Sequence, residues 1–495
     1  MNVVDYLFEK SCAFDKECIL GSSGTILYSA LYKNVNDTSS YISDTFGAGN
    51  NILLLSENSI FFVVNYLAII KSGNTVVLVE TQISDVDLKM VIDTATPVAF
   101  FVEDNLKNKV SGEYIFTEND KDVFKERKKA LPKSKDDANI NDVALIIFTS
   151  GSTGGKKGVM LTHKNIMANT ESIIAYLKLT ENDRMEIVLP FFYCYGLSLL
   201  HTYLRVGGSM VLNRSIFLGS VIDEMKKYKC TGFAGVPSTF QILINKTNFL
   251  NQSFPSLRYM TQAGGKLANV YIKKILDSFP SKQFFVMYGA TEATARLSYL
   301  DPNIASDKLG SIGKGIDGVT LEVVDEHGEN VKNDGIGEIA ASGDNLMKGY
   351  YKDPIETKEV LKNGKYYTGD LATIDESGFI YIVGRKKNII KSGGYRVSPY
   401  EIENIINNID KASDCIVVGI PDDILGEGIV ALVETEHPSQ ELKKEIISLC
   451  KKNLPSYKCP KKIFFTNNLP RNASNKIDIV KVKDYCLNPS TLLVD

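Results

Sequence analysis

The sequence lacks the features that mark several common protein classes. Lys and Arg together number 56 against 59 Asp and Glu, so the net charge is −3 and no basic surplus indicates a nucleic-acid or anionic-membrane partner. The apolar run at 60–70 contains Asn65 and is too short to span a bilayer. The first residues carry no basic segment followed by an apolar one, so we expect no secretion signal.

Metal-binding and disulfide patterns are also missing. The eight cysteines form no Cys-x-x-Cys pair, and they show no metal-ligand spacing with the four histidines. Scattered thiols fit a reducing compartment, and we therefore expect a cytoplasmic protein. What the sequence does have is length: 495 residues, 44% of them hydrophobic, are enough for two or more globular domains.

The first part of the chain alternates between two kinds of apolar segment. Runs at 51–55, 75–79 and 98–102 predict buried strands, and the segments 59–71 and 86–93 between them predict helices. Strands that alternate with helices are typical of right-handed βαβ units and a mostly parallel sheet.

The alternation stops at 103–142 and then resumes. This charged segment predicts a solvated connector; a nucleic-acid-binding tail is the alternative, but acidic residues are interleaved with its lysines. Beyond it the sequence predicts strands at 143–149, 186–189, 209–212, 232–236 and 284–287. It predicts helices at 165–177 and 221–227, and one more between the strands 186–189 and 209–212.

After residue 300 the pattern changes twice. Short strands with Gly/Asp turns at 319–324, 337–341 and 379–383 predict a small β-rich subdomain. Beyond Gly384 a compact α+β pattern follows, with helices at 399–407 and 441–452 and strands at 414–419 and 462–466. We therefore expect an α/β protein with a large N-terminal domain at 1–385 and a small α+β C-terminal domain at 386–495.

The segment TSGSTGGKKGV at 149–159 follows a predicted strand and is expected to precede a helix. Its glycines let backbone N–H groups approach an anion, its hydroxyls donate hydrogen bonds, and Lys156 or Lys157 adds positive charge. This composition predicts a polyphosphate site, with a plain Gly/Ser turn as the alternative. The Walker pattern is absent, because three residues separate Gly151 from Gly155 and Lys157 follows Lys156.

The same segment resembles the signature loop of adenylate-forming enzymes, the superfamily of acyl- and aryl-CoA synthetases, amino-acid adenylation domains and luciferases. Lys156 stands where the family usually has proline, and Lys157 takes the position of the family's lysine. The resemblance implies that the following residues bind ATP: Thr149, Ser150, Gly151, Ser152, Thr153, Gly154 and Lys157.

Three further segments resemble the parts of this family that enclose the acid. PFFYCYG at 190–196 resembles the wall of the acyl pocket, with a tyrosine at 193 where histidine is frequent. GVPSTF at 235–240 and QAGGKL at 262–267 resemble two turns of the family, the second of which would place Gly264 and Gly265 against adenine and substrate. The resemblance implies a substrate pocket that is lined by Tyr193, Tyr195, Gly196, Val236, Ala263 and Gly264.

YGATEA at 288–293 resembles the family's Y-G-x-T-E motif. The resemblance implies that Tyr288 and Gly289 lie against the nucleotide, with the tyrosine stacked on adenine. Thr291 would contact phosphate. Glu292 would hold Mg²⁺, for which a carboxylate oxygen is a suitable ligand. A turn with a solvated glutamate is the alternative.

Two motifs near the predicted domain boundary also match the family. TGDL at 368–371 implies that Asp370 accepts hydrogen bonds from both ribose hydroxyls. The long match at 384–403, GRKKNIIKSGGYRVSPYEIE, implies that Arg385 reaches ribose or phosphate and that Lys387 is the hinge. It also implies a channel for the thiol of CoA, formed by Lys391, Gly393, Gly394 and Tyr395.

LPRNASNKI at 469–477 resembles the family's last motif. It implies that Lys476 is the mobile catalytic lysine, which contacts the substrate carboxylate and the α-phosphate. Asn475 replaces the usual glycine, and we expect the loop to keep its shape because Asn tolerates positive φ. Lys157, Glu292 and Lys391 complete the implied catalytic set.

The motifs together imply activation of a carboxylic acid by ATP and Mg²⁺ through an acyl-adenylate, followed by transfer to a thiol. We expect an apolar or aromatic acid, such as a fatty acid, and CoA as acceptor, since the pocket segment holds no aspartate for a substrate ammonium. Three alternatives stay open: loading of an acyl or amino acid onto the phosphopantetheine of an acyl carrier protein, a kinase-like phosphotransferase, and a catalytically silent nucleotide-binding protein.

Overall fold

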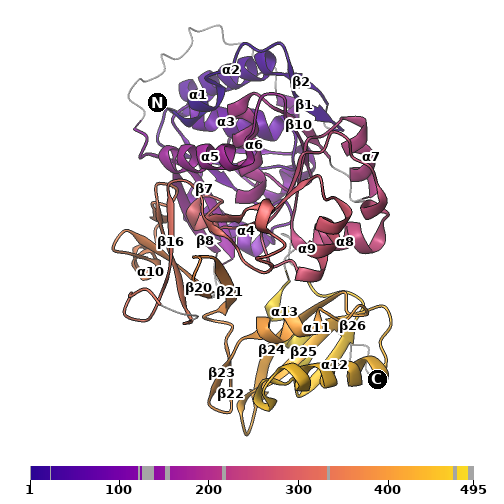
Figure 1. Ribbon diagram of the computed structural model, residues 1–495. Helices are drawn as coiled ribbons and strands as arrows, with labels where there is room; N and C mark the ends of the chain where they lie inside the picture. The colour runs from indigo at the N-terminus through magenta and orange to yellow at the C-terminus, as the bar shows by residue number, and fades with distance from the viewer. Residues whose placement is uncertain are drawn as a thin grey trace.

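The computed structural model describes residues 2–22, 24–120, 123–124, 139–150, 156–213, 219–331, 335–471 and 477–488. The strands within these ranges form four sheets, two large and two small (Figure 1). The two large sheets and the helices around them occupy the N-terminal part of the chain. This mixed α/β architecture is the one that the alternation of apolar segments predicts.

The seven-stranded sheet has the order β18-β8-β7-β4-β3-β5-β6. Its strands are β3 (Asn51–Leu55), β4 (Thr75–Leu78), β5 (Ala99–Val102), β6 (Ile115–Phe116), β7 (Val143–Ser150), β8 (Lys156–Thr162) and β18 (Gly349–Tyr350). The strands from β7 to β6 run parallel, whereas β8 and β18 are antiparallel to their neighbours. Since β6 lies inside the segment 103–142, part of the predicted connector contributes a strand to the sheet.

The nine-stranded sheet has the order β15-β14-β13-β12-β11-β9-β10-β1-β2. Its strands are β1 (Glu17–Gly21), β2 (Ile26–Leu27), β9 (Arg184–Ile187), β10 (Ser209–Leu212), β11 (Gly232–Gly235), β12 (Tyr259–Gln262), β13 (Gln283–Tyr288), β14 (Ser298–Leu300) and β15 (Lys314–Gly315). The strands from β1 to β13 are parallel, so their C-terminal ends meet at one edge of the sheet. That edge carries Gly235, Gln262 and Tyr288, the starts of three motifs.

Helices pack between and around the two large sheets. They are α1 (Val3–Phe8), α2 (Tyr28–Phe46), α3 (Ile60–Lys71), α4 (Asp85–Ala95), α5 (His163–Leu177), α6 (Cys194–Val206), α7 (Gly219–Lys227), α8 (Pro237–Lys246) and α9 (Asn269–Ser278). One hydrophobic core joins residues of both sheets with α3, α5 and α6, for example Ile147, Ile166, Leu200 and Met210. The sheets are therefore held together through a shared layer of helices.

Local sequence explains where these helices begin. Ser59 caps α3 by accepting a hydrogen bond from the backbone of Phe62, and most of the α3 side chains that follow are buried. Thr162 and Asn165 form a reciprocal capping box at the start of α5. Pro237 occupies the first turn of α8, where its missing N–H leaves no bond unmade.

The structure corrects the expectation that the segment 149–159 leads into a helix. Thr149 pairs with Lys157 and Ser150 with Lys156, so the segment joins two antiparallel strands, β7 and β8, of a hairpin. The helix α5 begins only at His163. The lysines therefore stand on a strand, and no helix N-terminus directly follows the glycines to attract an anion. Residues 151–155 lie outside the described part of the chain.

The two small sheets follow in sequence. The first contains β16 (Val319–Val324), β17 (Gly337–Gly343), β19 (Leu361–Lys362), β20 (Lys365–Ile374) and β21 (Ile380–Arg385), with α10 (Pro354–Val360) beside it. The second contains β22 (Ile390–Ser392), β23 (Tyr395–Val397), β24 (Asp414–Asp422), β25 (Gly426–Glu434) and β26 (Lys462–Thr466), with α11 (Pro399–Ile406), α12 (Gln440–Asn453) and α13 (Ile479–Leu487). The chain passes from one small sheet to the other between Arg385 and Ile390.

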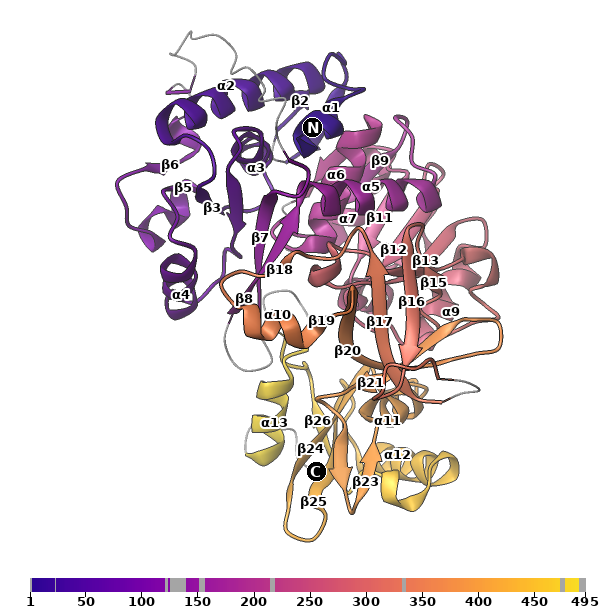
Figure 2. The ribbon, with the colours of Figure 1, turned by 90° about the vertical axis from the view of Figure 1, so that its left-hand side faces the viewer.

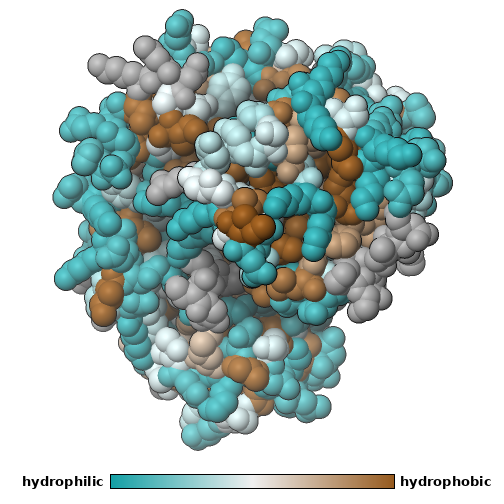
Figure 3. Space-filling model, turned by 90° about the horizontal axis from the view of Figure 1, so that it is seen from below, coloured by the Kyte–Doolittle hydropathy of each residue, from teal (hydrophilic) through white to brown (hydrophobic). Residues whose placement is uncertain are grey.

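The C-terminal elements form the lower end of the molecule in both ribbon views (Figures 1 and 2). They contact the large part through α8 and α9: Tyr271 donates a hydrogen bond to the Ser413 carbonyl, 2.7 Å, and Lys246 pairs with Glu436. From below, hydrophilic side chains cover most of the visible surface, with hydrophobic ones in small groups (Figure 3). Among the described helices, none is long and apolar enough to cross a membrane.

A buried carboxyl in the nine-stranded sheet leads to a prediction about stability. Glu186 on β9 is fully buried and accepts a hydrogen bond from the Asn213 amide, 3.0 Å. Burial raises its pKa from 4.5 to about 8. The unfolded chain releases this proton near pH 4.5 and the folded protein near pH 8, so stability falls as pH rises between these values.

Replacing Glu186 by glutamine is expected to make unfolding less dependent on pH. Because one fewer proton is taken up on folding, the slope should change by about 1.4 kcal/mol per pH unit between pH 5.5 and 7.5. Urea unfolding at several pH values measures this slope. The exposed Glu326 provides the control variant Glu326→Gln. Equal slopes for wild type and Glu186→Gln would show that the buried carboxyl is ionised throughout.

Candidate active site

Three motif residues meet where the nine-stranded sheet approaches the first small sheet. Asp370 on β20 pairs with Arg385 on β21 in the strand register, and Tyr288 ends β13. The Tyr288 hydroxyl donates to Asp370 Oδ2, 2.6 Å, and Arg385 Nε donates to Asp370 Oδ1, 2.7 Å. Asp370 is buried, while the Arg385 side chain is 59% exposed. A buried carboxylate thus joins residues from three motifs.

The electrostatics of this cluster follow from the carboxylate. The negative charge of Asp370 raises the pKa of the Arg385 guanidinium above its usual range. Burial, followed by the charge of Asp370, raises the pKa of the Tyr288 phenol well above its usual value. A carboxylate has about four acceptor positions, so two remain for further hydroxyl donors. The arrangement fits recognition of a vicinal diol.

Glu292 lies near Lys157 through an intervening tyrosine. The Tyr350 hydroxyl on β18 donates to Glu292 Oε1, 2.9 Å, and the Lys157 ammonium lies 5.4 Å from the centre of the Tyr350 ring. Lys157 itself forms an ion pair with Glu356 of α10. A phosphate that approached Lys157 would compete with this carboxylate.

The residues around Glu292 fit a magnesium ion that is shared with phosphates. Within the described residues, Glu292 Oε2 has no hydrogen-bond donor, and so it can bind a cation. Mg²⁺ in phosphate sites needs only one or two carboxylates, since phosphates and waters complete its shell. No cluster of three or more acidic, His or Cys side chains with metal-binding geometry occurs in the described part of the chain. A magnesium site here would therefore depend on the nucleotide.

Thr149, the first residue of the phosphate segment, bonds across the hairpin, and Lys156 is connected to the acid-pocket segment through Glu80. The Thr149 hydroxyl donates to the Lys157 carbonyl, 3.5 Å, across the hairpin. Lys156 Nζ lies 2.8 Å from Glu80 Oε1, and the Tyr193 hydroxyl donates to Glu80 Oε2, 2.6 Å. Lys156 and Tyr193, which are two of the departures from the family pattern, contact the same carboxylate.

The pocket segment meets the YGATEA motif at the start of α6. The Thr291 hydroxyl donates to Cys194 Sγ, 3.4 Å. Gly196 and Gly289 are required by packing: an added Cβ would lie 2.1 Å from the Pro190 carbonyl oxygen in the first case. In the second it would lie 1.8 Å from the Ala295 carbonyl oxygen. The motif glycines therefore hold two loops in close contact.

The remaining predicted pocket residues line the same edge of the sheet. The Tyr195 hydroxyl is 2.8 Å from Thr261 Oγ1 on β12, and Ala263 follows that strand as a buried residue. Val236 precedes α8 as its N-cap. Gly264 has φ +88°, which favours glycine, and the carbonyl of Gly265 accepts from the Gln262 amide, 2.8 Å.

Other predicted residues do not join this cluster. Gly393 and Gly394 form the positive-φ turn of the β22–β23 hairpin, and Lys391 donates its backbone N–H to Glu427, 2.7 Å. Tyr395 is 54% exposed and stacks on Tyr457 of the same domain, 4.1 Å between ring centres. Figure 1 places β22 and β23 at the end of the C-terminal domain away from the large sheets.

The other predicted residues of the C-terminal part lie at its two ends. Lys387 is exposed, in the turn between β21 and β22. Lys476 and its neighbours 472–475 lie outside the described residues, as do Gly151, Ser152, Thr153 and Gly154.

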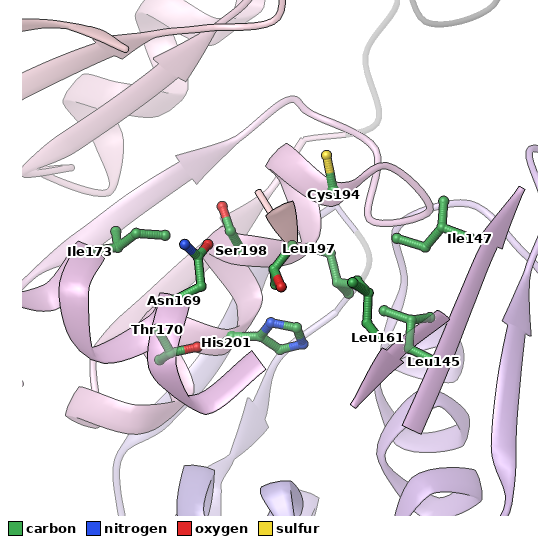
Figure 4. A pocket seen from close by; sticks show the side chains of 11 residues that line it. Leu145, Ile147, Leu161, Asn169, Thr170, Ile173, Cys194, Leu197, Ser198 and His201 are labelled. Atoms are coloured by element: carbon green, nitrogen blue, oxygen red, sulfur yellow. The ribbon is translucent and has the colours of Figure 1, made fainter. Parts of the chain in front are cut away.

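A small cavity borders the site (Figure 4). It measures about 10 Å³, the room that one water molecule needs, and it lies between β7, β8, α5 and α6. Cys194 and Thr294 line it together with Asn169, Thr170 and His201. Burial lowers the pKa of His201 to about 3, and its Nε2 is 2.8 Å from the Tyr66 hydroxyl. A neutral, buried histidine fits a structural role.

Sequence reasoning missed several residues that shape the site. Glu80, Tyr350 and Glu356 lie between motifs, in segments where nothing in their spacing singles them out. Each is distant in sequence from the motif residue that it contacts, and the tertiary fold brings the two together. Arg296 is a further case, although it lies only three positions beyond the end of the YGATEA motif.

Comparison with family models and curated proteins adds to this geometry. The AMP-binding enzyme model matches residues 8–351, and the AMP-binding enzyme C-terminal domain model matches residues 401–476. The oxalate–CoA ligase of Arabidopsis thaliana is 30% identical over 453 residues, which cover 87% of each chain. The 2-succinylbenzoate–CoA ligase of Bacillus pumilus is 30% identical over 464 residues, 92% of each chain.

A solved structure shows the same fold. The crystal structure of ATP-bound MatB from Rhodopseudomonas palustris superimposes with a TM-score of 0.90 at 25% sequence identity. The match covers 98% of this chain and 99% of that one. The likeness therefore includes both large sheets and the C-terminal domain.

Proposed function

Since this chain belongs to the AMP-binding enzyme family and is an acid–thiol ligase of the acyl-CoA synthetase type, we propose that it joins a carboxylic acid to CoA in two steps. An oxygen of the acid first attacks the α-phosphorus of ATP, and the bond to the β-phosphate breaks to release pyrophosphate. The CoA thiolate then attacks the acyl carbon, and AMP leaves. The observation that carries this proposal is the Tyr288–Asp370–Arg385 cluster beside Glu292 and Lys157.

In the first step the protein positions two anions and offsets their charge. Asp370 accepts from the ribose hydroxyls through its two remaining acceptor positions, and Arg385 adds a donor at its exposed end. Lys157 exchanges Glu356 for phosphate oxygens. A magnesium ion, when bound at Glu292, neutralises charge on the pyrophosphate that leaves. The substrate carboxylate is already a nucleophile, so this site needs no general base.

The second step is proposed to use the C-terminal domain, residues 386–495. Rotation about Lys387 would withdraw Lys476 and bring the Lys391–Tyr395 hairpin, with its two glycines, to the acyl-adenylate. The exposure of Tyr395 supports a hairpin that is free to form a new contact. A few residues at such a turn can absorb the change in backbone angles.

Acid-dependent exchange of pyrophosphate into ATP tests the proposal. We expect exchange with one class of acid and formation of AMP and the acyl-CoA when CoA is added. ADP in place of AMP would show a phosphotransferase. Transfer to a phosphopantetheinylated carrier protein and not to CoA would assign the acceptor to the carrier. ATP binding without exchange for any acid would contradict the proposed activity.

A further inference from the structure

Arg296 is the largest fully buried side chain that the structure describes, with 1% of its surface exposed. Its backbone is fixed on both sides: its N–H donates to the Asn169 amide oxygen, 3.2 Å, and its carbonyl accepts from the amides of Asn169 and Asn345. These contacts hold the residue in place without its side chain. The guanidinium is therefore available for another role.

The positive charge of Arg296 has no negative partner in the described part of the chain. Nε donates to the Tyr176 hydroxyl, 3.1 Å, and the Arg296 side chain forms no other hydrogen bond with a described residue. Four other arginines form ion pairs with carboxylates, namely Arg205, Arg258, Arg385 and Arg471. Burial of a cation without an anion is unfavourable, so an anion from outside the chain would satisfy it.

The guanidinium lies beside residues that the family resemblance assigns to the acid pocket. Its carbon is 4.7 Å from the centre of the Tyr195 ring, and the Tyr195 hydroxyl contacts Thr261 just before the Ala263–Gly264 turn. The backbone of Arg296 also packs against the Tyr288–Gly289 turn, because a Cβ at Gly289 would lie 3.1 Å from the Arg296 Cα. Its charge thus lies next to the predicted pocket residue Tyr195 and the predicted nucleotide residues Tyr288 and Gly289.

We propose that Arg296 binds a second anionic group on the acid, so that the substrate is a dicarboxylic acid. A carboxylate matches the two free nitrogens of a guanidinium, which can donate two parallel hydrogen bonds. One carboxylate of the substrate reacts with ATP, and the other pairs with Arg296. This inference rests on the proposed adenylation. It replaces the apolar or aromatic acid that the pocket segment favoured, because Arg296 lies outside that segment.

The test compares matched acids with and without the second carboxylate. Malonate with propionate, succinate with butyrate, and phthalate with benzoate form three pairs for pyrophosphate exchange. Wild type is expected to prefer the diacid of at least one pair. Arg296→Met should lower kcat/KM for that diacid by roughly 10- to 100-fold, the loss expected for hydrogen bonds to a charge. KM for ATP and the rate with the monoacid should stay within about twofold.

Two further variants separate charge from packing. Arg296→Lys keeps the positive charge but loses the planar pair of N–H donors. Its rate with the diacid should therefore lie between those of Arg296→Met and wild type. Arg258→Met is the matched control, because Arg258 also lies over a tyrosine ring, 4.9 Å from the centre of Tyr259, but already holds Asp183. It should leave the diacid preference unchanged. Equal losses with both acids of a pair in Arg296→Met would show that Arg296 only packs the tyrosines.

A binding measurement keeps the inference separate from the activity. With α,β-methylene ATP present, the diacid should raise the melting temperature of wild type and not that of Arg296→Met. A rise in melting temperature without any pyrophosphate exchange would contradict the proposed activity but support the anion site at Arg296. Exchange with monocarboxylic acids alone would support the activity and overturn the role of Arg296. If neither the rise in melting temperature nor pyrophosphate exchange is seen, the proposed activity and the role of Arg296 are both overturned.

Discussion

Replacing Asp370 by asparagine is expected to raise KM for ATP on the order of 100-fold or more. Two hydroxyl hydrogen bonds to a charged acceptor are lost or weakened, and each contributes about 1.5–3 kcal/mol. Arg385 and Tyr288 also lose the carboxylate that holds them, 2.7 and 2.6 Å away. The effect should therefore exceed that of removing either neighbour alone. Initial rates of AMP formation over a range of ATP concentrations measure the change.

Asp344→Asn is the control for this variant. Asp344 is an exposed carboxylate, 65% of whose side-chain surface is accessible, and it pairs with Lys164 at 2.7 Å. Exposed pairs of this kind contribute little, so KM should change less than twofold. If Asp370→Asn leaves KM for ATP unchanged while the melting temperature falls, the buried carboxylate only stabilises the contact between β20, β21 and β13.

Replacing Lys476 or Lys391 by alanine is expected to separate the two half-reactions. Lys476→Ala should lower pyrophosphate exchange by about 10²–10³-fold, which is the effect of removing one donor that stabilises transition-state charge. Transfer from an acyl-adenylate that is supplied directly should change little. Lys391→Ala should slow transfer to CoA and change exchange little, because Lys391 lies on the β22–β23 hairpin, which Figure 1 places away from the large sheets.

Exchange without CoA and single-turnover transfer to CoA measure the two steps independently. Lys387→Pro adds a control for the hinge, since it restricts the backbone angles at the turn without removing either catalytic lysine. It should slow transfer more than exchange. Equal effects of Lys476→Ala and Lys391→Ala on both steps would contradict a rotation of the C-terminal domain between them.

Many of the regular elements were predicted from the sequence, and the misses have physical reasons. Runs such as 51–55 and 143–149 predict strands because parallel strands buried on both faces are uniformly apolar. The strand β8 was missed because its first residues, Lys156 to Gly158, are polar or flexible and gain their partners only by pairing with β7. The helices α1 and α2 and the strand β1 were not predicted, since α1 and β1 are short and polar residues interrupt the apolar positions of α2.

The sequence by itself determined the family, from which the proposed two-step chemistry follows. Short motifs such as TSGSTGGKKGV and YGATEA can be recognised because their residues are neighbours along the chain. Only the tertiary structure decided which of them meet. Tyr288 and Asp370 are 82 residues apart, and Lys157 and Glu356 are 199 apart. Arg296 likewise meets Tyr195 through packing alone. Such partners are set by how sheets and helices pack, and packing leaves no periodic pattern in the sequence from which they could be predicted.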